Sequence, residues 1–102
     1  MENKSSQIEK LFFNTRLQTI SLCKDLEPED MVLQTAENVS PIKWHLGHTT
    51  WFFEKFILSE LDENYKPFNK EYNFIFNSYY NSVGQFNPRN KRGYLNRPLL
   101  KD

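Results

Sequence analysis

The sequence is poor in several residue types, and each shortage excludes a class of protein. Its one cysteine, Cys23, cannot form an internal disulfide, which is typical of a protein from a reducing compartment. The three glycines form no glycine-rich phosphate-binding loop. No apolar run approaches the roughly 20 residues that span a bilayer. We therefore expect a soluble, cytoplasmic chain without a membrane partner, and its 102 residues suffice for one domain.

Net charge is also lacking, because 13 basic residues balance 13 acidic ones. This balance argues against a partner held by bulk electrostatics, such as nucleic acid. The charges are uneven near the end, where a basic segment contains Arg89, Lys91, Arg92 and Arg97. That segment is a local anion site or a solvated loop. Binding of single-stranded nucleic acid is a weaker alternative, because four charges are few for that role.

Aromatic residues are plentiful, at 16% of the chain, and the apolar residues recur at helical spacing in three regions. We expect helices at residues 6–24, 41–61 and 70–83, and a brief helical turn after Pro28. Ser40 is placed to cap the second helix, Pro41 to occupy its first position and Gly84 to stop the third. Residues 85–98 form an irregular basic tail. The predicted fold class is all-α, three helices of an incomplete four-helix bundle.

Both histidines and both tryptophans lie in one segment at the start of the second predicted helix. Trp44, His48 and Phe52 are four residues apart, so they share one helix face, and His45 lies close to that face. Neutral imidazole on the inward face of a helical bundle is a common ligand for iron, zinc and copper. Taken alone, His48 is either a metal ligand or a packed core histidine, and the sequence leaves both open.

Two arginines in the basic segment, Arg89 and Arg92, are three residues apart and near Pro88 and Gly93. Guanidinium groups at that spacing can bind a carboxylate with paired hydrogen bonds. The alternative is a solvated basic loop, which is common on protein surfaces. The sequence contains no recognisable pair of catalytic carboxylates and no nucleophile with a histidine partner, so it identifies no catalytic residue.

Three ordered motifs resemble one family. They are Ser-Pro-Ile-Lys-Trp-His-Leu-Gly-His-Thr-Thr-Trp-Phe-Phe-Glu at 40–54, Phe-Asn-Ser-Tyr-Tyr-Asn-Ser-Val-Gly at 76–84 and Arg-Gly-Tyr-Leu-Asn-Arg-Pro at 92–98. Together they resemble the N-terminal, DinB-like domain of the ergothioneine-biosynthesis sulfoxide synthases. The resemblance extends over most of the chain, from Thr15 to Pro98.

The resemblance implies an oxidoreductase fragment. Members of the family are non-haem iron enzymes that use oxygen to join the sulfur of cysteine or γ-glutamylcysteine to hercynine, giving a sulfoxide. Their iron is held by three histidines, of which the one in the Leu-Gly-His segment corresponds to His48. His45 matches a position that is not a ligand. The family's Arg-x-x-Arg-Gly element binds carboxylates of the thiol substrate and corresponds to Arg89 and Arg92.

The chain also departs from the family. The later His-x-x-x-His pair and the large catalytic domain are absent from these 102 residues. We therefore expect a truncated piece, residues 1–102 of a DinB-like domain, that is inactive alone. It would use Fe(II) only in a complete site, with the missing catalytic segment as its partner. The alternative is a non-enzymatic helical module that pairs with another chain or with itself.

Overall fold

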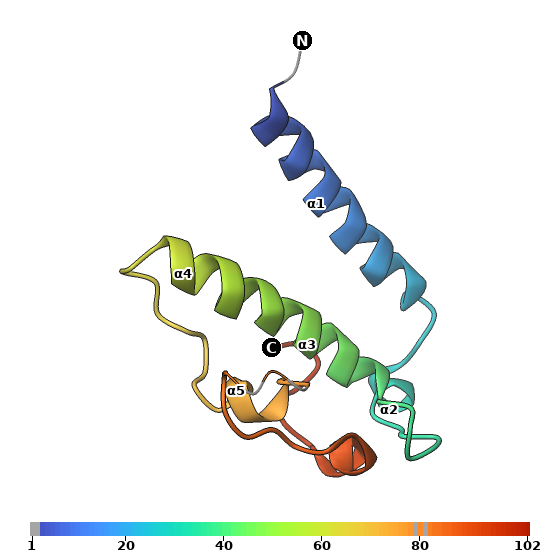
Figure 1. Ribbon diagram of the computed structural model, residues 1–102. Helices are drawn as coiled ribbons and strands as arrows, with labels where there is room; N and C mark the ends of the chain where they lie inside the picture. Colours follow the sequence, from blue (N-terminus) through green and yellow to red (C-terminus); the bar gives the residue numbers. More distant parts are fainter. Residues whose placement is uncertain (1–2, 79, 81) are drawn as a thin grey trace.

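The computed structural model describes residues 3–78, 80 and 82–102 (Figure 1). Within these residues it contains no strand, only an isolated bridge between Ala36 and Val39. The helices, in chain order, are α1 (Lys4–Leu22), α2 (Pro28–Met31), α3 (Ile42–Phe53), a π-helical turn (Glu54–Leu58), α4 (Ser59–Leu61), α5 (Tyr72–Ile75) and a 3₁₀ helix (Arg89–Tyr94). The predicted all-α class is confirmed at this level.

The first two predicted helices are present. α1 begins after Asn3, whose side-chain oxygen accepts a hydrogen bond of 2.8 Å from the Ser6 backbone N–H. α3, the π-helical turn and α4 follow one another directly and make the second long stretch, which ends at Leu61. The two stretches meet near α2 and diverge from there (Figure 1).

The predicted start of the second helix is wrong by one residue. Pro41 has φ −59° and ψ 150°, so it is the N-cap itself and the helix begins at Ile42. Ser40 is therefore one position too early to cap, and no side-chain hydrogen bond caps α3. The Ser40 hydroxyl instead accepts a hydrogen bond of 2.8 Å from the Arg92 guanidinium.

The third predicted helix, residues 70–83, is also wrong, because α5 is the only helix among the described residues of this range. The backbone carbonyls of Ile75 and Phe76 accept hydrogen bonds from the Trp44 and His48 side chains of α3, which tie this segment to α3. The fully buried Asn77 side chain then bonds the backbone N–H and carbonyl of Tyr80, as asparagine does in turns.

This change removes the third helix of the expected bundle. Within residues 3–78, 80 and 82–102, α1 and the α3–α4 stretch are the only long helical segments. Tyr79 and Asn81, part of the predicted third helix, lie outside the described residues. Gly84 has φ 123°, a conformation that favours glycine, but it does not end a helix.

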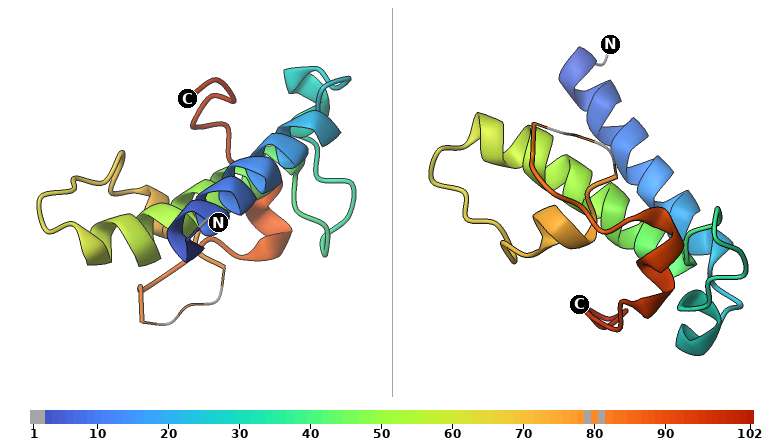
Figure 2. Two further views of the ribbon diagram at one scale, coloured as in Figure 1. Left: turned by 90° about the horizontal axis from the view of Figure 1, so that it is seen from above. Right: turned by 60° about the horizontal axis from the view of Figure 1, so that its bottom comes forward.

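The core lies on one side of α3. Trp44, Trp51 and Phe76 are its buried cluster, and Phe52 packs against it as the four-residue spacing predicted. α5 and the C-terminal segment cover this side, whereas α1 lies along the other (Figures 1 and 2). The core is small because α1 contributes no buried side chain to it.

α1 is attached to α3 by a few contacts. The Arg16 guanidinium donates hydrogen bonds of 3.0 and 2.7 Å to the hydroxyls of Thr49 and Thr50. The rings of Phe12 and Phe53 meet edge to face, with their centroids 5.0 Å apart. The rest of α1 keeps its large apolar side chains exposed, among them Ile8, Leu11, Leu17 and Ile20.

Candidate functional site

His48 is held by both its ring face and one ring nitrogen. The imidazole stacks on the Trp44 indole, with an interplanar angle of 10° and centroids 4.6 Å apart. Its Nδ1 atom lies 2.6 Å from the backbone carbonyl oxygen of Phe76. Because a carbonyl oxygen can only accept, Nδ1 carries the hydrogen, and in the neutral ring Nε2 keeps its lone pair. Metal-binding histidines are oriented in the same way, through a hydrogen bond from their second nitrogen.

Arg92 is a buried cation, with only 3% of its surface exposed. It comes from the 3₁₀ helix, which lies beside the start of α3 (Figures 1 and 2). Its guanidinium carbon is 3.6 Å from the centroid of the Trp44 ring, and its Nη1 atom donates to Ser40. A cation–π contact and a hydrogen bond offset part of the cost of burying the charge.

Gln34 fixes the 3₁₀ helix at two points. Its side-chain N–H donates a hydrogen bond of 2.6 Å to the backbone carbonyl of Arg89. Its side-chain oxygen accepts one of 2.7 Å from the backbone N–H of Gly93. A Cβ atom on Gly93 would lie 2.7 Å from the Cβ atom of Gln34, so the absence of a side chain permits this approach.

An open cavity of about 480 Å³ brings the predicted residues together. His48 and His45 reach it from α3, and Arg89 and Arg92 reach it from the 3₁₀ helix. The remaining lining includes Ser40, Trp44 and Ser78. The two sequence motifs, separated by about 40 residues in the chain, therefore lie at one site.

The cavity has a cationic side. The pKa of His45 is lowered, mainly because the ring is partly buried. The nearby His48, Arg92 and Arg89 lower it further through charge repulsion. His45 is nevertheless exposed over the residue as a whole. Two arginines at a cavity wall suit an anionic group such as a carboxylate.

The metal-ligand set within the described part of the chain is incomplete. Residues 3–78, 80 and 82–102 contain no cluster of three or more histidine, cysteine or acidic side chains that could hold an ion. His48 fits the role of one ligand because its Nε2 is available and its ring is fixed. Iron would need further ligands, because one imidazole does not hold it.

Sequence reasoning missed the supporting roles of Ser40, Trp44 and Gln34. Ser40 was expected to cap a helix and Trp44 only to pack the core, yet both contact Arg92. Gln34 had no expected contact with the basic segment, which is 55 residues away from it at Arg89. Contacts between residues so far apart in the sequence cannot be predicted from the spacing of neighbouring residues.

Comparisons with known proteins add no family assignment. No model of a known protein family matches the chain, and a search of curated proteins finds no match. Within the described residues, every helix is too short or too polar to cross a membrane.

Proposed function

We propose that this chain is the N-terminal, DinB-like part of a non-haem iron-dependent sulfoxide synthase of ergothioneine biosynthesis, in the cytoplasm. The observation that carries the proposal is the cavity shared by His48, Arg89 and Arg92. The resemblance to that family assigns these three positions to iron and to the thiol substrate. The contact between His48 Nδ1 and the Phe76 carbonyl supports a ligand role for Nε2.

Each residue has a defined task in this proposal. His48 would hold Fe(II) through its Nε2 lone pair, and the Phe76 carbonyl keeps the ring oriented. Arg89 and Arg92 bind the carboxylates of cysteine or γ-glutamylcysteine, and Trp44 keeps the Arg92 guanidinium in place. When bound, the iron supplies the activation of oxygen for joining sulfur to hercynine.

The remaining ligands would come from a partner segment. The family's His-x-x-x-His pair does not occur in the 102 residues, and His45 occupies a non-ligand position in the resemblance. The chain alone is therefore expected to bind Fe(II) poorly and to have no activity. The partner would be a segment that carries that pair and the catalytic domain.

Anaerobic Fe(II) titration tests this proposal. We would titrate the chain, a separately expressed partner segment and their mixture, each with wild-type, His48→Ala and His45→Ala chains. The expected result is tight binding only in the mixture, lost with His48→Ala and kept with His45→Ala. Equal binding by the mixture with wild-type and His48→Ala chains would refute the ligand role.

A second candidate function is a helical interaction module, favoured by the exposed apolar side chains of α1. Leu11, Leu17 and Ile20 are 67%, 62% and 64% exposed, a high value for three large residues of one helix. Sedimentation velocity over a range of concentrations tests self-association. A shift to larger species that Leu17→Gln removes, together with failure of the iron titration, would favour this candidate.

A further inference from the structure

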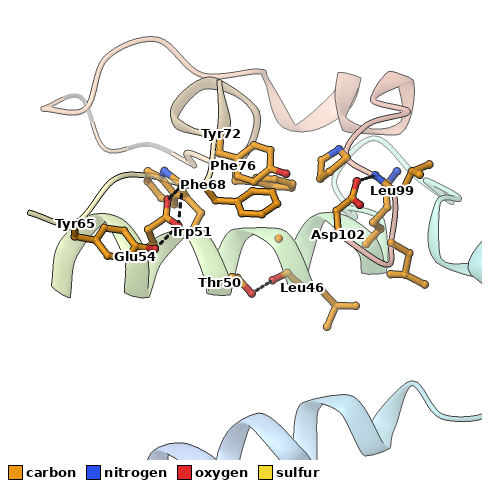
Figure 3. Close-up of a pocket in the computed structure, with 14 residues that line it drawn as sticks. Leu46, Thr50, Trp51, Glu54, Tyr65, Phe68, Tyr72, Phe76, Leu99 and Asp102 are labelled. Carbon is orange, nitrogen blue, oxygen red and sulfur yellow. Dashed lines mark hydrogen bonds between the residues drawn. The ribbon is translucent and has the colours of Figure 1, made fainter. Parts of the chain in front are cut away.

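A second cavity, separate from the one that holds His48, lies on the α5 side of α3. It has a volume of about 250 Å³ and is bordered by α3, α5 and residues 98–102. Figure 3 shows the rings of Phe68, Tyr72 and Phe76 together on one side, above the helix that carries Thr50 and Glu54. The two cavities share no lining residue, so ligands in them can be distinguished.

Aromatic rings form much of the cavity wall. Phe68 stacks on Tyr72 with centroids 5.7 Å apart, and Tyr72 meets Phe76 edge to face at 5.1 Å. Phe76 lies against Gly47, where a Cβ atom would come within 2.2 Å of the ring. Trp51 adds a further ring to the lining. Ring faces carry partial negative charge, so they attract cations as well as apolar groups.

Two carboxylates add negative charge to this aromatic wall. Glu54 accepts a hydrogen bond of 2.9 Å from the Tyr65 hydroxyl and a longer one, at 3.3 Å, from the Phe68 backbone N–H. These bonds fix the carboxylate beside the rings (Figure 3). Asp102 accepts a bond of 3.1 Å from the Leu99 backbone N–H at the other end of the cavity.

Both carboxylates act on Tyr72, a residue of the cavity lining. Burial raises the pKa of the Tyr72 hydroxyl, and the charges of Asp102 and Glu54 raise it further. Lys43 also lines the cavity, and burial followed by the charge of Arg97 lowers its pKa. The lining thus contains two carboxylates and one ammonium, and its net charge favours a cation.

From this geometry we infer that the cavity binds a compact organic cation, an ammonium attached to an apolar or aromatic body. The ammonium lies beside Glu54, and the body lies among the rings of Trp51, Phe68 and Tyr72. Cation–π attraction and the fixed carboxylate act on the charge, while burial of apolar surface acts on the body. A neutral molecule of the same shape lacks the positive charge on which the first two act.

The two tryptophans allow a direct test, because each reports on one cavity. Trp51 lines the aromatic cavity and donates its indole N–H to Asn73, whereas Trp44 lines the His48 cavity and donates to the Ile75 carbonyl. We would titrate the ¹⁵N-labelled chain with benzylammonium and follow both indole N–H signals. Benzyl alcohol, a neutral probe of similar shape, and benzoate, an anion, are the matched comparisons.

The expected result is a saturable shift of the Trp51 signal with benzylammonium, about five- to tenfold tighter than with benzyl alcohol, and no such shift with benzoate. Equal affinity for the cation and the neutral probe would overturn the proposal. Equal shifts of the Trp44 and Trp51 signals would also overturn it, because that pattern indicates non-specific binding.

Two variants separate the charge from the rings. Glu54→Gln keeps an acceptor for Tyr65 and should remove most of the preference for benzylammonium over benzyl alcohol. Glu60→Gln, an exposed acid on α4 outside the cavity, should leave it unchanged. Phe68→Leu, at a ring that is 67% exposed and hence tolerant of change, should weaken the binding of benzylammonium severalfold. An unchanged preference in Glu54→Gln refutes the inference.

Discussion

The imidazole of His48 donates its Nδ1 hydrogen to the backbone carbonyl of Phe76 across 2.6 Å. This bond joins α3 to Phe76, the residue that follows the last residue of α5. It also leaves Nε2 of the neutral ring with the lone pair that a metal ion would need. The same contact therefore affects both the fold and the proposed iron site.

The protonation of this ring is the first prediction. In the neutral state, His48 should be the tautomer with hydrogen on Nδ1, because the Phe76 carbonyl can only accept. Long-range ¹H–¹⁵N correlation spectra distinguish the two ring nitrogens. A hydrogen on Nε2 in the neutral ring would contradict the orientation on which the ligand role depends.

Substitution of Trp44 is the second prediction. Trp44→Leu removes the contact with the Arg92 guanidinium and leaves the Ile75 carbonyl without its indole donor. We expect a loss of about 3–5 kcal/mol in the free energy of unfolding, measured by urea denaturation, because a buried ring is also lost. Tyr94→Leu, at a residue of the 3₁₀ helix that is 84% exposed, should change it by less than about 0.5 kcal/mol.

Gly47→Ala is the third prediction, and the direction of the change in the free energy of unfolding tests the packing of Phe76. At an exposed helix position this change stabilises a protein by about 1 kcal/mol, because alanine is the better helix former. Here the new Cβ would come within 2.2 Å of the buried Phe76 ring, so we expect destabilisation of about 1–3 kcal/mol. Gln18→Ala on the exposed side of α1 is the control. Stabilisation by Gly47→Ala would show that Phe76 does not pack there.

The attachment of α1 leads to the fourth prediction. Its amide hydrogens should exchange with solvent faster than those of α3, because α1 has no buried side chain and contacts α3 at few points. Arg16→Gln should accelerate exchange in α1 further and leave the centre of α3 unchanged. Hydrogen–deuterium exchange with mass spectrometry measures both, and equal protection of the two helices would be inconsistent with this arrangement.

The sequence predicted the parts of the fold that depend on local periodicity. The spacing of apolar residues located α1 and the α3–α4 stretch to within a few residues. It failed at residues 70–83, because the Trp44 and His48 side chains, about 30 residues earlier in the chain, take the carbonyls of Ile75 and Phe76. A local pattern contains no information about such competition.

The candidate site shows the same division. Resemblance to a family selected His48, Arg89 and Arg92, and the structure places all three at one cavity. Neither spacing nor resemblance predicted the cation–π contact between the Arg92 guanidinium and the Trp44 ring. Nor did they predict that the Ser40 hydroxyl accepts a hydrogen bond from Arg92. Trp44 and Ser40 have these roles because the basic segment packs against the start of α3.

The most direct test of the proposed function is product formation by two separate pieces. We would mix the chain with a segment that carries the His-x-x-x-His pair and the catalytic domain, then add Fe(II), oxygen, hercynine and a thiol substrate. Mass spectrometry should detect the sulfoxide only in the mixture; His48→Ala should abolish it and His45→Ala should retain it. No sulfoxide from two folded wild-type pieces, or the same yield with His48→Ala, would contradict the account.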